Sequence, residues 1–391
     1  MDLRALVPLD EESVLRSARA NTGLSELGDP RGLEPFRLAM HSLDQEADLH
    51  LVGRLMARSD VLIWLEARLH VTELFRRHPE IADEEIRSPV FITGIGRSGT
   101  SFLFEVMAQA PEARVPRTWE ALFPHPPPGP DSESGDDPRI ARAHALITQH
   151  VRVVPQLATM HELAGHLPCE CGLVMAPSFV TDHILAHHYM PTYAGWLESH
   201  PWTFGYEFHK QMLQVLQWKY RKPYWLLKAP NHHEHLPTLL ATYPDARIVQ
   251  THRDPIQAMS SVTDLLGCLQ HQRSDRPFDA AGFEKLMVGE ATAQRLERVI
   301  QLRDAGVVRP ESIVDVRYED LIEDPLRVVR EVYAHFALPL GDEAARRMTA
   351  YVASKPRHKF GRHDYDTSVA AAAERPLFER YQRRYRISNE I

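Results

Sequence analysis

The sequence predicts an α/β fold, in which a parallel β-sheet is flanked by helices. The first observation is that short apolar, β-rich runs alternate with helical stretches from about residue 89 to residue 336. The second is a glycine-rich turn at residues 94–99, placed between one such run and a helical stretch. The third is the helical spacing of apolar residues before this region. Alternating strands and helices of this kind are typical of a parallel sheet covered on both faces.

The chain is expected to contain an N-terminal helical extension and one α/β domain. Residues 1–88 form the extension, because leucines and valines recur there at helical spacing with Arg and Glu between them. Residues 89–391 form the domain, which carries a helical insert at about residues 120–220. A stretch rich in Pro, Gly and acidic residues, 124–138, predicts an exposed loop near the start of that insert.

The elements of the α/β domain follow one another in a regular order. The first strand is expected at 90–93, a β-rich apolar run of the kind that is buried in parallel sheets. Further strands are expected at 224–227, 246–251 and 313–316, and helices at about 101–110, 236–243, 256–266, 278–305 and 325–336. The last segment, 355–391, is rich in Arg and aromatic residues and is expected to fold back over the sheet.

The composition excludes several classes of protein. Hydrophobic residues make up 43% of the 391 residues, which is too much for a mainly disordered chain. Three cysteines cannot build a disulfide scaffold. The formal net charge of −8 argues against broad nucleic-acid binding, which needs a basic face. A small anionic ligand remains possible, since a few local arginines suffice to bind it.

The sequence also predicts where the protein resides. The first residues lack the apolar core of a signal peptide, because Asp and Glu stand in its place. No stretch approaches about 18 consecutive apolar residues, so stable membrane insertion is not expected. We therefore expect a cytoplasmic protein. The abundance of Ala and Arg beside scarce Lys is typical of a GC-rich bacterial genome.

A phosphate-binding loop is the sharpest local signal. The run Gly94-Ile-Gly-Arg-Ser-Gly-Thr-Ser101 follows the first expected strand and matches the P-loop pattern G-x-x-x-x-G-K-S/T, except that Thr100 replaces the lysine. The glycines allow backbone N–H groups to point at an anion near a helix N-terminus. The cation of this loop is Arg97. In a P-loop-like sheet, a cation at this position inside the loop suits an anion that is shorter than a triphosphate.

A second anion site is predicted where another strand ends. Arg253 follows the strand at 246–251, and Ser261 lies on the helix after it. The planar fork of Arg253 suits a phosphate, and the Ser261 hydroxyl could donate to the same group. The alternative for Arg253 is a salt bridge with Asp254 or another carboxylate. Two anion sites at the carboxyl ends of one sheet predict a nucleotide that carries phosphate groups at both ends.

These segments together resemble the sulfotransferases that use 3′-phosphoadenosine 5′-phosphosulfate (PAPS). They look most like bacterial members that carry an Arg-Ser-Gly-Thr phosphosulfate loop. The matching segments lie in the same order, at 91–103, 225–236, 244–262, 316–325 and 358–365. The resemblance extends from about Pro89 to Arg386, and its motifs are individually modest but jointly specific.

The resemblance implies a role for each matching residue. Arg97 would contact the 5′-phosphate of the donor, and Lys228 would lie near the transferring sulfonate. Phe102 stands where many members have a Trp beside the adenine. The remaining donor contacts would come from Ser98, Gly99, Thr100 and Ser101 at the 5′-phosphosulfate, from Arg253 and Ser261 at the 3′-phosphate, and from Tyr318 and Lys359 nearer the adenine.

The resemblance also implies a mechanism. The sulfonate would move from PAPS to a hydroxyl of a small-molecule acceptor by in-line displacement, for which positioning and electrostatics do most of the work. No metal is required, because the donor has no β- and γ-phosphate pair to bridge. The acceptor must lose a proton, so a base is needed. His232 fits a Lys-x-Pro-x-His form of the bacterial relatives, although a histidine at a helix start can also merely pack.

Other interpretations remain open from sequence alone. Glu162 and Glu170, in the insert, are alternative bases. His183, His187 and His188 invite a zinc site, but the usual zinc motifs do not occur, so packing or an acceptor pocket is favoured. A P-loop kinase or NTPase, a non-catalytic nucleotide-binding protein, and a sulfonation that activates a hydroxyl for elimination are the alternative functions. The identity of the acceptor and the oligomeric state stay undetermined.

Overall fold

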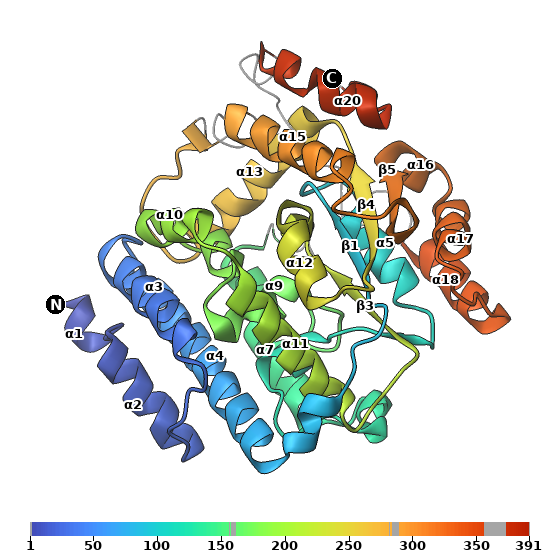
Figure 1. Cartoon of the computed structure of the whole chain (residues 1–391). Coiled ribbons are helices and arrows are strands. Elements are labelled where there is room, and N and C mark those ends of the chain that lie inside the picture. The colour runs from blue at the N-terminus through green and yellow to red at the C-terminus, as the bar shows by residue number, and fades with distance from the viewer. Residues whose placement is uncertain are drawn as a thin grey trace. The chain divides into compact units, whose positions relative to one another are not determined.

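The chain folds into two compact units (Figure 1). The computed structural model describes residues 2–155, 157, 162–280, 282–283, 289–355 and 373–390, with backbone alone at residues 133–134. The first unit, here the helical unit, comprises Met1–Ile86, Pro116–Arg221 and Leu266–Phe278. The second, here the sheet unit, comprises Arg87–Val115, Lys222–Leu265 and Asp279–Ile391.

The sheet unit contains a parallel five-stranded sheet in the order β2-β3-β1-β4-β5. The strands are β1 (Val90–Gly94), β2 (Ala113–Arg114), β3 (Tyr224–Lys228), β4 (Arg247–His252) and β5 (Ile313–Arg317). The predicted parallel α/β sheet is thus confirmed. The edge strand β2 was not expected, because two residues are too few to show a strand period.

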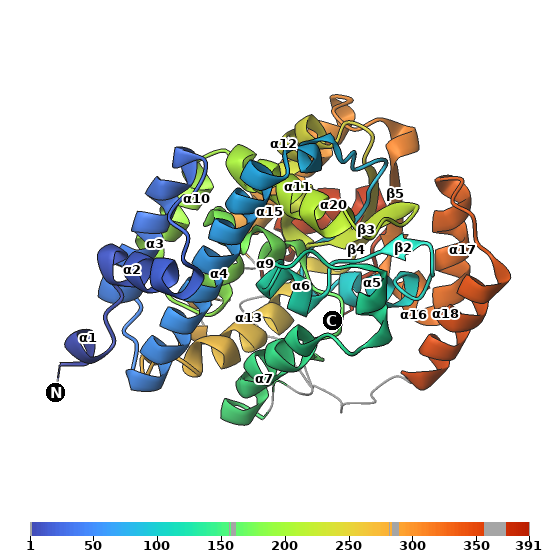
Figure 2. The ribbon, with the colours of Figure 1, turned by 90° about the horizontal axis from the view of Figure 1, so that it is seen from below.

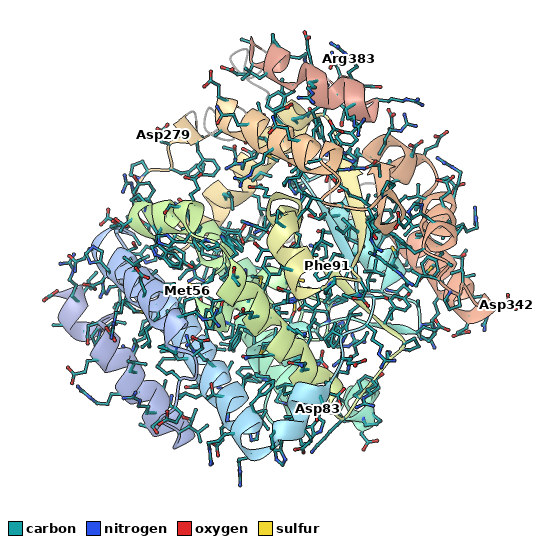
Figure 3. The ribbon with its side chains drawn as sticks, viewed as in Figure 1. Met56, Asp83, Phe91, Asp279, Asp342 and Arg383 are labelled. Carbon is teal, nitrogen blue, oxygen red and sulfur yellow. The ribbon has the colours of Figure 1, made fainter. Side chains whose placement is uncertain are left out.

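The central position of β1 in the sheet explains why its sequence is largely apolar. All five of its residues are buried, since helices cover both faces of the sheet. Alternate residues point to opposite faces. Ile92 belongs to a core cluster with Leu103 and Phe104, whereas the Phe91 ring meets that of Tyr243 on the other face. Figure 3 shows Phe91 in the interior of its unit.

Two layers of helices cover this sheet. The helices of the unit whose bounds the structure describes are α5 (Thr100–Met107), α12 (Leu236–Thr242), α13 (Pro255–His271, which belongs to the helical unit from Leu266 on), α15 (Glu290–Asp304), α16 (Tyr318–Glu323), α17 (Pro325–His335), α18 (Asp342–Ser354) and α20 (Glu379–Tyr385). Helices α5, α17 and α18 pack together on one face (Figure 2). Helices α12 and α15 contribute Leu236 and Val299 to a core cluster with Ile248 of β4 on the other.

One expected helix is interrupted. Within the predicted range 278–305, residues 280 and 282–283 are helical, but the chain is extended at Gly289 and α15 begins at Glu290. Gly289 has an extended backbone, with φ −86° and ψ −162°, and Phe278 is not helical. The physical reason is the weak helix propensity of glycine, which allows the chain to turn before α15.

The helical unit combines the N-terminal residues with the expected insert. Its helices are α1 (Leu3–Leu6), α2 (Glu11–Thr22), α3 (Leu33–Gln45), α4 (Leu51–Arg77), α6 (Thr118–Leu122), α7 (Pro138–Val153), α9 (Cys171–Met175), α10 (Pro191–Ser199) and α11 (Thr203–Gln217). The caps of α2 show how single residues set the bounds of a helix. At its start, the Asp10 side chain accepts a hydrogen bond from the Ser13 N–H at 2.8 Å. At its end, Gly23 adopts the left-handed conformation, with φ 69°.

None of the helices that the structure describes is both long enough and apolar enough to cross a bilayer.

Candidate active site

A strained loop connects β1 to α5 and has the shape of a phosphate cradle. Gly94, Arg97 and Gly99 all have positive φ angles, of 143°, 64° and 93°. A Cβ atom at Gly94 would lie 2.3 Å from the backbone oxygen of Thr251, so a larger residue cannot occupy this position. Helix α5 begins at Thr100, directly after the loop. Its N-terminal N–H groups and positive dipole end therefore lie at the loop, as anion binding requires.

Ser98 holds this loop in place with its side chain. Its hydroxyl donates to the backbone oxygen of Ile95 at 2.6 Å and shares a 2.6 Å hydrogen bond with the hydroxyl of Thr251. Thr251 in turn donates to the backbone oxygen of Thr93 at 3.2 Å. Ser98 is fully buried, so in this structure its hydroxyl braces the loop against β4. The predicted contact of Ser98 with the donor stays a prediction.

Lys228 and Ser101 meet at the same end of the sheet. Lys228 ends β3 and pairs in register with Ile92 of β1. Its side chain is 2% exposed. Its Nζ donates to the Ser101 Oγ at 3.0 Å, at the start of α5. The two predicted residues are therefore brought together, and the buried ammonium supplies positive charge beside the loop.

Arg97, Arg253 and Ser261 also converge. The Arg97 Nε donates to the Ser261 Oγ at 3.0 Å, and the Arg253 Nη1 donates to the backbone oxygen of Arg97 at 2.9 Å. The Arg253 guanidinium lies 4.0 Å from the centre of the Tyr318 ring. A Cβ at Gly99 would lie 3.2 Å from Tyr318, so that ring flanks the loop as well. Hydrogen bonds thus link the residues of the two predicted anion sites.

A carboxylate occupies the fork of Arg253. Its Nε and Nη2 donate to the two carboxylate oxygens of Glu390 at 2.8 and 2.7 Å. The alternative weighed from the sequence, an ion pair with a carboxylate, is therefore present, but Asp254 is not the partner. The buried Asp254 pairs with Arg375 at 3.2 Å and accepts the Glu390 N–H at 2.9 Å. A cavity of about 370 Å³ opens here, lined among others by Arg253, Tyr318 and Glu390.

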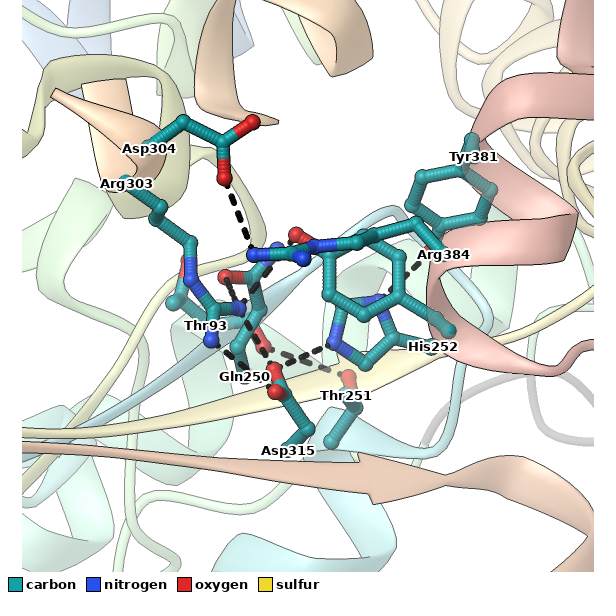
Figure 4. Close-up of polar contacts among 10 residues, drawn as sticks. Thr93, Gln250, Thr251, His252, Arg303, Asp304, Asp315, Tyr381 and Arg384 are labelled. Atoms are coloured by element: carbon teal, nitrogen blue, oxygen red, sulfur yellow. Dashed lines mark hydrogen bonds and ion pairs between the residues drawn. The ribbon is translucent and has the colours of Figure 1, made fainter. Parts of the chain in front are cut away.

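The end of β4 is anchored by a network that the motifs did not reveal (Figure 4). The ring of His252 lies between the Tyr381 hydroxyl, at 2.9 Å, and Asp315, at 2.8 Å. Arg303 donates to both oxygens of Asp315 at 2.6 and 2.9 Å. Tyr385 stacks on His252, with ring centres 3.8 Å apart.

These contacts set the charges in the network. Burial lowers the pKa of His252, so its imidazole is neutral at neutral pH. Burial alone would raise the pKa of Asp315, but the hydrogen bonds from His252 and Arg303 hold it well below its usual range. Asp315 is therefore ionised, the His252 Nε2–H donates to it, and the Nδ1 accepts from Tyr381. The rigid network holds the strand end that precedes Arg253.

The comparisons with known proteins decide the family. A family model described as the sulfotransferase family matches residues 89–342 of this chain. The chain belongs to the sulfotransferase family.

Solved structures and curated relatives agree with this assignment. The crystal structure of sulfotransferase STF1 from Mycobacterium tuberculosis H37Rv is 29% identical, covers 95% of this chain and 98% of its own, and has a TM-score of 0.78. That of STF9 from Mycobacterium avium is 25% identical, covers 98% of both chains, and has a TM-score of 0.85. The omega-hydroxy-beta-dihydromenaquinone-9 sulfotransferase Stf3 of Mycobacterium bovis is 25% identical over 288 residues, which are 69% of this chain and 68% of Stf3.

His232 is packed inside this sulfotransferase, and its role as the base stays a prediction. His232 lies in the 3-10 turn Pro230–His235 and has no exposed surface. Its ring contacts Phe91 edge-on, with centres 5.0 Å apart. Phe91 points to the opposite face of β1 from Ile92, which packs with α5. His232 therefore lies on the face of the sheet that α5 does not cover.

The other predicted residues are placed as follows. Phe102 is half-buried and packs against the core cluster beneath α5, α17 and α18. Glu162 is exposed and Glu170 directly precedes α9, both in the helical unit. Lys359 lies outside the described residues. The roles of these four residues stay predictions.

The histidines that invited a zinc site form a buried polar cluster in the helical unit. His188 accepts a hydrogen bond from Arg273 at 3.0 Å, and Arg273 pairs with Asp60 at 2.7 Å. Burial lowers the pKa of His183, His187 and His188, so these rings are neutral. Within the ranges that the structure describes, no group of three or more His, Cys, Asp or Glu is arranged to hold a metal ion.

Proposed function

We propose that this sulfotransferase transfers the sulfonate group of PAPS to a hydroxyl of a small-molecule acceptor. The observation that carries the proposal is the convergence of Arg97, Lys228, Arg253 and Ser261 on the loop between β1 and α5. PAPS has a phosphosulfate at one end and a 3′-phosphate at the other. Cationic groups at both ends of one surface match that charge distribution.

The donor would lie with its phosphosulfate on the loop and its 3′-phosphate on the fork of Arg253. Backbone N–H groups at the start of α5 and the Arg97 guanidinium would bind the 5′ end. Tyr318 flanks the loop next to Arg253, and the cavity beside it supplies space for the nucleoside. The two ends of the nucleotide would thus fix its orientation.

Group transfer requires that one bond breaks as another forms. The bond between sulfur and the 5′-phosphate oxygen breaks, and the acceptor oxygen bonds to sulfur on the opposite side. The leaving adenosine 3′,5′-bisphosphate gains negative charge, which Lys228 and Arg97 would stabilise. The acceptor proton passes to a base. His232, Glu162 and Glu170 stay the three candidates, which single substitution to Gln would distinguish by loss of kcat.

A hydroxyl acceptor is supported by the name of one relative. Stf3 is named for an omega-hydroxylated dihydromenaquinone, a small molecule that carries a hydroxyl group. The chemistry proposed for the present chain needs only such a hydroxyl on the side of the sulfur atom that is opposite the leaving 5′-phosphate oxygen.

The proposal predicts that Arg253 recognises the 3′-phosphate. In Arg253→Ala, the Kd for adenosine 3′,5′-bisphosphate should rise by about 10- to 100-fold, since charged bidentate hydrogen bonds are lost. The Kd for adenosine 5′-phosphate, which lacks that phosphate, should stay unchanged. Isothermal titration measures both, and Arg309→Ala is the control, since Arg309 is an exposed arginine of the same unit.

Two results would overturn the proposed function. One is that adenosine 3′,5′-bisphosphate and adenosine 5′-phosphate bind with the same Kd, both to the unmodified protein and to Arg253→Ala. The other is tight, magnesium-dependent ATP binding without any response to the bisphosphate, which would favour a kinase or NTPase.

A further inference from the structure

Glu390 presents to Arg253 the same pattern of oxygens that a phosphate would present. Both carboxylate oxygens accept from the guanidinium fork, at 2.8 and 2.7 Å. Carboxylates and phosphates are recognised by arginine in this bidentate geometry. The two N–H groups that face Glu390 cannot donate to a phosphate in the same plane at the same time.

The segment that carries Glu390, residues 386–390, is held in place by several contacts. Arg386 ends α20 in the left-handed region, at φ 56°, and the Ile387 N–H donates to the Gln382 backbone oxygen at 2.9 Å. Asn389 accepts from the Gln382 amide at 2.8 Å. The Glu390 N–H donates to buried Asp254 at 2.9 Å. These contacts direct the Glu390 carboxylate at Arg253.

The same segment forms part of the wall of the cavity beside Arg253. Ile387, Ser388 and Glu390 line it together with Arg253 and Tyr318. The side chains of Arg253 and Glu390 remain 13% and 32% exposed. Water therefore screens the ion pair in part, and a partly exposed pair of this kind is weak enough for a ligand to displace.

We propose that Glu390 competes with the 3′-phosphate of the donor for Arg253, so that segment 386–390 must release this arginine before the nucleotide binds. The inference rests on the proposed function, because it assigns the 3′-phosphate to Arg253. The nucleotide-binding state is then a fraction of the molecules, and the apparent Kd equals the intrinsic Kd divided by that fraction. A nucleotide without a 3′-phosphate has no group to displace Glu390, so the segment also contributes to selectivity.

Substitution of Glu390 tests the competition directly. In Glu390→Gln, the Kd for adenosine 3′,5′-bisphosphate should fall by about three- to tenfold, because the ion pair with Arg253 is removed. The Kd for adenosine 5′-phosphate should not change. Glu379→Gln is the matched control: it removes the same charge from exposed Glu379 on α20, and it should leave both values unchanged. The double variant Arg253→Ala/Glu390→Gln should show the weak binding of Arg253→Ala alone.

The opposite result would overturn the inference. If Glu390→Gln binds the bisphosphate with unchanged or lower affinity, Glu390 does not compete, and a lower affinity would show that it orients Arg253. This failure differs from failure of the proposed function. In the latter case neither the unmodified protein nor Glu390→Gln would bind the bisphosphate, or Arg253→Ala would bind it as well as the unmodified protein does.

Discussion

Lys228 is a charged residue at the end of a strand whose other residues are apolar. All five residues of β3 are buried, and burying an ammonium group costs free energy unless it is paired or hydrogen-bonded. The hydrogen bond to Ser101 satisfies one of its protons at the start of α5. A buried cation beside this loop agrees with the charge stabilisation proposed for Lys228.

We expect Lys228→Met to slow the reaction more than it weakens donor binding. The charge of Lys228 is proposed to act on the leaving group, so kcat should fall by about 100- to 1000-fold, while the Kd for PAPS, in which the leaving oxygen has not yet gained charge, changes little. Initial rates at saturating PAPS and isothermal titration give the two values. Lys219→Met, at an exposed site in the helical unit, is the control. A variant with normal kcat would exclude this function for Lys228.

The packing of a neighbouring segment against helix α4 depends on a single glycine. Helix α4 spans 27 residues and has a glycine, Gly53, in its first turn. The backbone of Arg273 approaches it closely, and the His50 N–H donates to the Arg273 backbone oxygen at 3.2 Å. A Cβ atom at position 53 would lie 1.8 Å from that oxygen. The segment Leu266–Phe278 therefore packs on α4 only because no side chain intervenes.

Two glycine-to-alanine substitutions in helices should have opposite effects on stability. Gly53→Ala should lower the free energy of unfolding by about 1–3 kcal/mol or more, because backbone atoms must move apart. In Gly195→Ala, on α10, the new methyl group would have no neighbour within 4 Å. This substitution should raise the free energy of unfolding by about 0.5–1 kcal/mol. Urea denaturation measures both, and equal effects would contradict the packing described for Gly53.

Neutral histidines are buried in both units, and they make the stability of the whole molecule depend on pH. Burial lowers the pKa of His209, in the helical unit, to about 3. Burial also lowers the pKa of His252 and His233 in the sheet unit. In the unfolded chain each imidazole titrates near its ordinary pKa of about 6.5. Below that pH the unfolded state binds more protons than the folded state, so acid favours unfolding.

Stability should therefore be greatest above about pH 6.5 and should fall as the pH decreases toward the folded-state pKa values. Each such histidine contributes a slope of up to about 1.4 kcal/mol per pH unit within that window. Urea denaturation at about pH 7.5, 6.5 and 5.5 measures the slope. His209→Gln should reduce it by about 1.4 kcal/mol per pH unit at the acid end. An unfolding free energy that is constant over this range would contradict the prediction.

The agreement between sequence and structure differs from element to element. Strands β1, β3, β4 and β5 lie within one or two residues of their expected positions, because apolar runs bounded by Gly and Pro are local signals. The break before α15 and the short strand β2 were missed. A glycine in a helical pattern does not reveal whether the chain turns there, and two residues carry no period. The network of His252, Arg303 and Asp315 was missed because its members come from separate elements.

The sequence by itself determined the α/β class, the phosphate-type loop and the resemblance to sulfotransferases, since each rests on a local period or a short motif. The tertiary structure decided which groups meet. It brought Lys228 to Ser101, 127 residues apart, set Glu390 on Arg253, 137 residues apart, and placed His232 in the core. The physical reason is that strand order in a parallel sheet brings distant strand ends together, and a motif read along the chain contains no information about that order.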